Sequence, residues 1–182
     1  GRITSYYRER GYFLSRAYLP EQDVSQGIIT IAVLEGRLGQ VLIDNKSRVR
    51  DKIVQRPLRD IKPGQMMMAE DLETPLLKLS DIVGIQATTT LVPGETIGTS
   101  DLKVDITAAP LITGTLELDN FGNKYTGEAR LGGSLRINSP LGMGDRFDLR
   151  AMGSDESHVF YRAQYAIPVG TWATELGAAY SD

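Results

Sequence analysis

From Ile112 onward, apolar and polar residues alternate in five long runs, and this pattern constrains the fold more than any other feature of the sequence. Side chains of a β-strand point alternately to opposite faces, so a period of two predicts strands with one apolar and one polar face. No helical period occurs in this half of the chain. Turn residues separate the runs, at 120–124, 138–144, 153–157 and 168–170. The sequence therefore predicts an antiparallel meander after Pro110.

Two architectures fit such a meander. A soluble antiparallel sheet packs one face on a core and exposes the other to water. A transmembrane β-barrel instead has strands of about 9–11 residues, with lipid outside and water inside. The length of the runs favours the barrel, because strands of globular proteins typically have about 5–6 residues. The apolar face also has little side-chain volume, with Gly and Ala among the leucines. A lipid-facing surface tolerates this better than a packed soluble core does. Aromatic residues suit an interfacial girdle: Tyr161, Tyr165, Trp172 and Tyr180.

Strict alternation assigns each side chain to one face, because a slip of one residue exchanges the two faces. In a barrel, we expect these apolar side chains to face lipid: Leu116, Leu131, Leu135, Leu149, Val159, Tyr161 and Leu176. We expect these charged side chains to face the lumen: Glu117, Glu128, Arg130, Arg136, Arg150 and Arg162.

The residues before Pro110 mix helical and strand periods. The periods predict the order β-α-α-β-β, with elements at 38–43, 48–55, 69–80, 85–92 and 102–107. Because Pro75 is tolerated best in a first helical turn, the second helix is also open to a start near Glu73. Residues 3–34 repeat the last three elements as a helix at 3–10 and strands at 14–19 and 28–34. The nearly continuous apolar run of 28–34 is typical of a strand that is covered on much of its surface.

Composition excludes several classes of function. The chain has no Cys and one His, His158, which we expect to be a solvated loop residue. Thiolate metal sites, disulfides and the common imidazole clusters are therefore ruled out. A formal net charge of −3 argues against nucleic acid as a partner. We expect no enzyme activity and no metal site. Since the chain starts without Met and stops as a strand pattern finishes, we interpret it as an interior piece of a longer protein.

The stretch 119–150 resembles the opening of the barrel in two-partner-secretion transporters, the haemolysin secretion/activation family of the Omp85 superfamily. The matching residues are Asp119, Asn120, Gly122, Thr126, Gly127, Arg130, Asn138, Pro140, Leu141, Gly142, Gly144 and Asp145. Ser139 departs from the family's more usual pattern, in which Asn directly precedes Pro-Leu-Gly. Upstream, residues 33–45 resemble the family's junction between two POTRA domains, which have the order β-α-α-β-β.

The resemblance implies an α+β POTRA region followed by strands of a 16-stranded outer-membrane barrel, and a protein that uses no nucleotide and no cofactor. Residues 1–37 would be the C-terminal part of a first POTRA domain, 38–109 a second, and 110–182 the first barrel strands. It also implies that the POTRA domains bind the secretion domain of an exported partner protein in the periplasm and that the barrel conducts this partner outward through the outer membrane. Two alternatives stay open: an Omp85-type barrel-insertion factor, and a soluble β-rich interaction or carbohydrate-binding protein.

One strand of the second POTRA unit is a candidate for binding the partner. The topology places the first strand of the final hairpin at a sheet edge, where an extended guest strand can add through main-chain hydrogen bonds. This strand has no Lys or Pro to block pairing before Pro93. Its residues are Ile85, Gln86, Ala87, Thr88, Thr89, Thr90 and Leu91. A second candidate is the basic cluster of Arg48, Arg50, Lys52 and Arg56, which is otherwise a solvated helix face.

Overall fold

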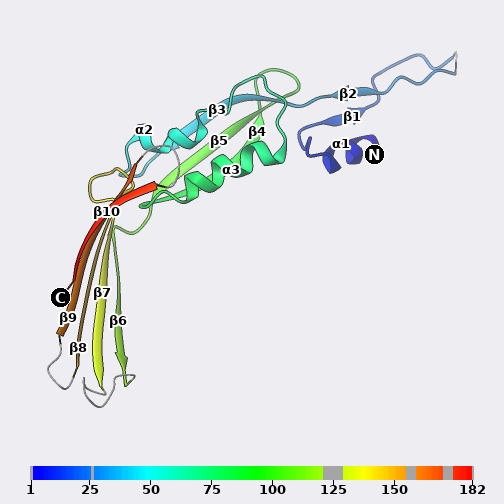
Figure 1. The fold of residues 1–182 in the computed structure, drawn as a ribbon. Coiled ribbons are helices and arrows are strands. Elements are labelled where there is room, and N and C mark those ends of the chain that lie inside the picture. The colour runs from blue at the N-terminus through cyan, green and yellow to red at the C-terminus, as the bar shows by residue number, and fades with distance from the viewer. Residues whose placement is uncertain (1, 26, 121–128, 155–158, 170–173, 182) are drawn as a thin grey trace. The chain divides into compact units, whose positions relative to one another are not determined.

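The computed structural model describes residues 2–25, 27–120, 129–154, 159–169 and 174–181. The chain divides into two compact units. One comprises Gly1–Asp44, Pro57–Ser80 and Ala87–Ile106, and the other Asn45–Arg56, Asp81–Gln86 and Thr107–Asp182. Figure 1 shows the elements in chain order. Among the described residues, no helix is long and apolar enough to cross a lipid bilayer.

The chain begins with a helix and two short strands, which confirms the expected helix-strand-strand order. Helix α1 is Arg2–Glu9, and strands β1 (Arg16–Tyr18) and β2 (Ala32–Leu34) form a two-stranded antiparallel sheet. The expectation of a covered strand at 28–34 is wrong. Only its last three residues pair, and Ile28 and Ile29 are 67% and 63% exposed. Since a β-branched run becomes buried only where another layer packs on it, periodicity alone overestimated its burial.

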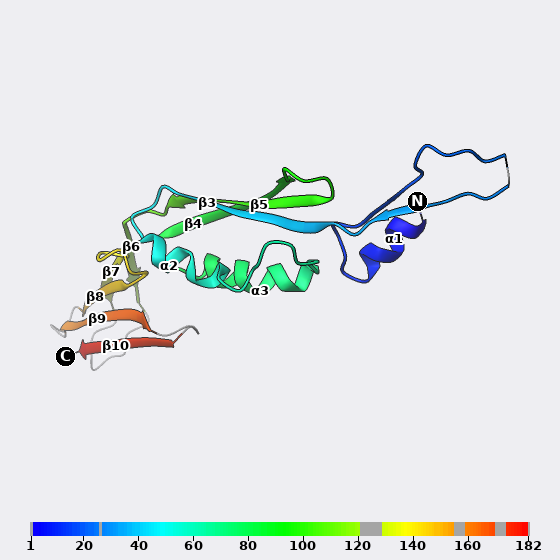
Figure 2. The ribbon, with the colours of Figure 1, turned by 90° about the horizontal axis from the view of Figure 1, so that it is seen from above.

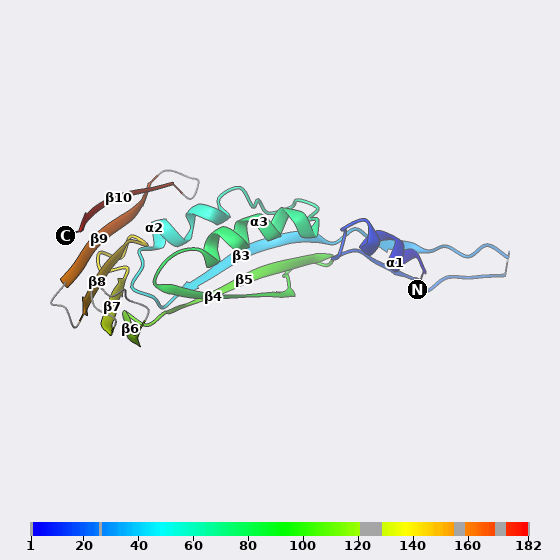
Figure 3. The same cartoon turned by 60° about the horizontal axis from the view of Figure 1, so that its bottom comes forward.

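A three-stranded sheet with helices confirms the predicted β-α-α-β-β order. Strands β3 (Arg37–Asn45), β4 (Ile85–Pro93) and β5 (Thr99–Ala108) are arranged in the order β3-β5-β4. Between β3 and β4 come helix α2 (Asp51–Val54), the 3-10 helix η1 (Arg56–Leu58) and helix α3 (Ala69–Ser80). Helix α3 lies along one face of the sheet (Figure 3). Fully buried side chains form the core beneath it: Leu38, Leu79, Leu102, Val104 and Ile106.

The first helix of this unit differs from the sequence expectation, whereas the second has the expected bounds of 69–80. Helix α2 is shorter than 48–55, because Asn45 donates from its amide to the carbonyl of Val49 at 2.9 Å and holds the preceding residues in a turn. Helix α3 starts at Ala69 and not near Glu73, so Pro75 lies inside it. The start is fixed by Asp71, whose carboxylate accepts the backbone N–H of Met68 at 2.9 Å.

The predicted meander after Pro110 is confirmed. Five strands, β6 (Ile112–Asp119), β7 (Arg130–Asn138), β8 (Arg146–Ser154), β9 (Val159–Val169) and β10 (Thr174–Ser181), form one sheet in the order β10-β9-β8-β7-β6. Each strand pairs antiparallel with the next. The sheet is curved, as the view in Figure 2 shows. Within its described part there is no helix.

Candidate functional site

The register of the five-stranded sheet separates apolar from charged side chains. Residues paired across an antiparallel ladder share a face. Leu131 pairs with Leu118 and Leu135 with Leu149, and following these pairs across the sheet puts all seven apolar residues of the sequence expectation on one face. The same pairs place Glu117, Arg130, Arg136, Arg150 and Arg162 together on the other face. Glu128, His158 and Trp172 lie outside the described residues.

The apolar face is exposed at all seven of these residues. Leu116 is 90% exposed and Leu118 80%, and Leu131, Val159 and Leu176 are each more than half exposed. Among the described residues no element covers these side chains. A contiguous apolar surface of this kind marks contact with a membrane or another protein, because it is unfavourable in water.

The opposite face carries a row of ion pairs. Arg130 contacts Asp119 at 2.8 Å, and Arg150 contacts Glu117 at 3.1 Å. Asp148 accepts from Arg136 at 2.6 Å and lies 3.6 Å from the Nε of Arg146. The other end of the Arg146 guanidinium contacts Glu175 at 2.8 Å. Because these groups are partly exposed, each pair contributes little to stability by itself, but together they keep the face charged and wetted.

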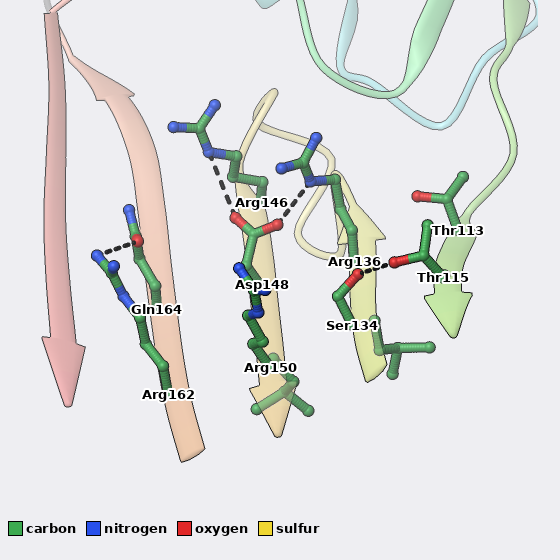
Figure 4. Close-up of a pocket in the computed structure, with 12 residues that line it drawn as sticks. Thr113, Thr115, Ser134, Arg136, Arg146, Asp148, Arg150, Arg162 and Gln164 are labelled. Atoms are coloured by element: carbon green, nitrogen blue, oxygen red, sulfur yellow. Dashed lines mark hydrogen bonds and ion pairs between the residues drawn. The ribbon is translucent and has the colours of Figure 1, made fainter. Parts of the chain in front are cut away.

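A solvent-accessible hollow of about 500 Å³ lies over the centre of this face. Figure 4 shows side chains from β6, β7, β8 and β9 around it, and the hydroxyl groups of Thr115 and Ser134 hydrogen-bond across two of these strands at 2.6 Å. Several residues of the face were not among the predicted site residues, including Asp119, Arg146, Asp148, Gln164 and Glu175. All of them occupy polar positions in the alternating pattern, and this pattern was the sequence signal that could have identified them.

The turn between β7 and β8 is built around a buried carboxylate. Asp145 has no exposed surface, and its oxygens accept the backbone N–H groups of Leu141 and Met143, each at 3.2 Å. The hydroxyl of Tyr165 donates a third bond at 2.9 Å. The hydroxyl oxygen of Ser139 accepts the backbone N–H of Gly144 at 3.0 Å. The motif residues of this turn therefore have a structural role that their spacing alone did not reveal.

Glycine is required in this turn because the backbone of residues 48–50 approaches it closely. Gly142 has a φ of +69°, and a Cβ at this position would lie 2.7 Å from the carbonyl oxygen of Arg48. Its own carbonyl accepts the N–H of Arg50 at 3.0 Å. The exposed basic side chains of Arg48, Arg50 and Lys52 thus extend from a segment that is hydrogen-bonded to the turn.

Strand β4, which contains the predicted partner-binding residues, lies at an edge of its sheet. Two backbone bonds fix its register with β5: Gly94 donates to Thr99 at one end, and Ala109 donates to Gly84 at the other. Both bonds belong to the same register, so even-numbered residues of β4 form the hydrogen-bonded pairs with β5. Thr88 therefore directs its N–H toward β5, whereas Thr89 directs its N–H away from it.

The described residues contain no group of three or more His, Asp or Glu side chains placed to hold a metal ion. The carboxylates of the charged face are instead engaged by arginines. The described residues therefore provide a five-stranded sheet with one charged, water-accessible face and one apolar face. They also provide β4 as the edge strand of the three-stranded sheet.

Comparison with known families finds two matches along the chain. Residues 1–36 match the model described as POTRA domain, ShlB-type. Residues 98–182 match the model described as haemolysin secretion/activation protein ShlB/FhaC/HecB. The two matches contain α1, β1 and β2 at one end and the whole five-stranded sheet at the other.

Curated relatives and a solved structure align over nearly the entire chain. The chain is 29% identical to the heme/hemopexin transporter protein HuxB of Haemophilus influenzae, over 96% of this chain and 31% of the relative. It is 30% identical to the outer membrane transporter CdiB of Dickeya dadantii, over 98% of this chain and 32% of the relative. The structure of CdiB from Escherichia coli is 30% identical with a TM-score of 0.65, over 98% of this chain and 34% of that chain. This chain thus spans about a third of the length of these relatives.

Proposed function

Because the chain belongs to the haemolysin secretion/activation family, we propose that its protein is the outer-membrane translocation pore of a two-partner secretion system. The observation that carries the proposal is the five-stranded meander with one exposed apolar face and one charged face. A sheet of this kind is viable in a bilayer only when closed into a barrel, where lipid covers the apolar face and water fills the interior. The remaining barrel strands come from the rest of the protein.

Each segment has a proposed place in this assembly. Residues 1–37 are the C-terminal part of a first POTRA domain and 38–109 a second, both in the periplasm. Residues 110–182 are the first strands of the barrel in the outer membrane. The face that contains Leu116 and Leu131 contacts lipid, and the face that contains Arg136 and Arg150 lines the lumen. The turn at 139–145 then lies on the periplasmic side, because β6 starts directly after the POTRA region.

The exported partner protein is recognised at the edge of β4. An extended segment of the partner pairs with this strand through the backbone groups of Ala87, Thr89 and Leu91, which the register directs away from β5. Main-chain bonds supply affinity that is largely independent of side-chain identity. The exposed side chains of Thr88 and Thr90 contribute selectivity.

The family assignment also discriminates against the alternatives. The matched model is that of secretion and activation proteins, which favours export of a partner over insertion of barrel proteins. A soluble sandwich requires a second sheet over Leu116 and Leu118, and the described residues provide none.

Secretion by the full-length protein tests the proposal. Cells that express the full-length protein together with a candidate exported partner are expected to release the partner into the medium, with the transporter in the outer-membrane fraction. Deletion of 38–109 should abolish release and leave the barrel in the membrane. The partner's appearance in the medium without the transporter, or a transporter found only in the soluble fraction, contradicts the proposal.

A further inference from the structure

Arg162 is left without a carboxylate partner on a face where the other described arginines are paired. Its guanidinium donates to the neutral amide oxygen of Gln164 at 3.0 Å. The described residues of the face comprise five arginines and four carboxylates. The four paired arginines are Arg130, Arg136, Arg146 and Arg150, and their partners are Asp119, Asp148, Glu175 and Glu117. One positive charge is therefore in excess, and it is localised at Arg162.

A second arginine, on the neighbouring strand, makes this excess of positive charge more pronounced. Arg150 on β8 lies directly opposite Arg162 on β9. Like charges at directly opposed positions destabilise a sheet unless an anion compensates them. Glu117 compensates Arg150 by reaching from β6 over β7, where Gly132 presents no side chain. No described carboxylate does the same for Arg162.

Both arginines line the hollow on the charged face, and Figure 4 shows their side chains with Gln164. A guanidinium presents a planar set of donors that matches a carboxylate. We propose that Arg162, assisted by Arg150, forms a binding position for the carboxylate side chains of an extended, acidic segment of the exported chain. This inference rests on the proposed function, because it is translocation that brings the exported chain past this wall.

An acidic segment fits this position better than a free anion does. The hollow is open and its cations are partly exposed, so a single ion is held weakly against water and salt. Successive carboxylates of one chain raise the local concentration of the next, so an acidic segment binds more strongly than its separate groups. The wall beside the arginines also offers the hydroxyl groups of Thr113, Thr115 and Ser134 to an extended backbone.

Current block of the reconstituted pore tests the inference. The full-length protein is inserted into a planar lipid bilayer, and an oligo-glutamate peptide is added on the POTRA side. The peptide is expected to block the parent current, and Arg162→Gln is expected to weaken the block about tenfold, since one charge-assisted contact is lost. Arg130→Gln is the matched control. It removes the same charge from the same face at a paired position, and it should stay within about twofold of the parent.

Each possible result of the current-block experiment either supports or overturns a role of Arg162 in binding acidic segments. Equal block of the parent and Arg162→Gln, or equal weakening by Arg162→Gln and Arg130→Gln, overturns the inference. Block by inorganic sulfate at the same concentration of charge as the peptide identifies a free-anion site and also overturns it. Arg162→Lys should retain part of the block if charge and geometry both contribute. A protein that forms no pore and exports no partner refutes the proposed function itself, whereas a conducting, exporting pore that is indifferent to Arg162 refutes only this inference.

Discussion

The phenolic hydroxyl of Tyr165 donates a hydrogen bond of 2.9 Å to a carboxylate oxygen of Asp145, whose residue has no exposed surface. Tyr165 is on β9, and Asp145 closes the turn that joins β7 to β8. The bond therefore ties a third strand to a turn between two others. Because the same carboxylate orders the backbone N–H groups of Leu141 and Met143, the fold of the turn and the position of β9 are coupled.

Tyr165→Phe removes one of the donors to this buried carboxylate. Loss of a hydrogen bond to a charged group costs about 1.5–3 kcal/mol, so we expect a lower free energy of unfolding and slower barrel assembly. Urea unfolding of the full-length protein in lipid vesicles measures this. Tyr180→Phe is the control, because Tyr180 is 62% exposed and on the apolar face. Equal loss of stability in both variants would show that the bond to Asp145 contributes nothing specific.

Gly142→Ala places a Cβ where the backbone of Arg48 already lies, at a residue with φ of +69°. A left-handed conformation costs a residue with a Cβ about 1–2 kcal/mol, and the clash adds to this cost. We expect reduced assembly, read as the folded fraction in unheated electrophoresis samples. Gly132→Ala is the matched control, since its Cβ would meet its neighbours only at 3.6 Å and beyond. If Gly142→Ala assembles as well as Gly132→Ala, the close approach at the turn is not required.

Leu131→Arg tests which face of the sheet contacts lipid. An arginine on the lipid side costs about 2–4 kcal/mol at the bilayer midplane and less near the interfaces. We expect Leu131→Arg to reduce the amount of folded protein in the outer membrane. Ser134→Glu is the control: it places a charge on the opposite, wetted face, directly across the ladder from Arg150, and is expected to change stability by less than about 0.5 kcal/mol. Similar membrane levels for the two variants would argue against the assignment of faces.

Thr89→Pro and Thr88→Pro separate partner binding from folding on adjacent residues of β4. Proline removes a backbone N–H, and the register directs the N–H of Thr89 away from β5 and that of Thr88 into the ladder. We expect Thr89→Pro to retain the fold and lose partner binding. Thr88→Pro should instead disrupt the hairpin. Secretion of the partner by the full-length protein, with limited proteolysis of the POTRA region as the folding readout, distinguishes these effects.

Thr88→Ser is the side-chain control for this pair, because it retains every backbone donor. It should secrete the partner at close to the parent level. If Thr89→Pro folds and secretes normally, strand addition at β4 is wrong, and the basic segment at Arg48 to Lys52 becomes the next surface to test.

The sequence by itself determined the order of the elements and the two faces of the meander. Both follow from local periodicity, because a period of two over nine residues has one register that keeps Leu131 and Leu135 together and Arg130 and Arg136 opposite them. The element order before Pro110 was equally readable. Burial could not be read from the sequence in the same way, because the apolar run at 28–34 is mostly exposed. Burial depends on whether a second layer packs against a strand.

Only the tertiary structure decided which charges meet. Glu117 reaches Arg150 across β7, and Arg162 is left with Gln164, because the relative register of four strands sets these distances. The outward direction of the Thr89 N–H likewise depends on the hairpin register with β5. The burial of Asp145 depends on Tyr165, which is twenty residues away along the chain. Such pairings are long-range consequences of packing, and a periodic pattern carries no information about them beyond the face on which each side chain lies.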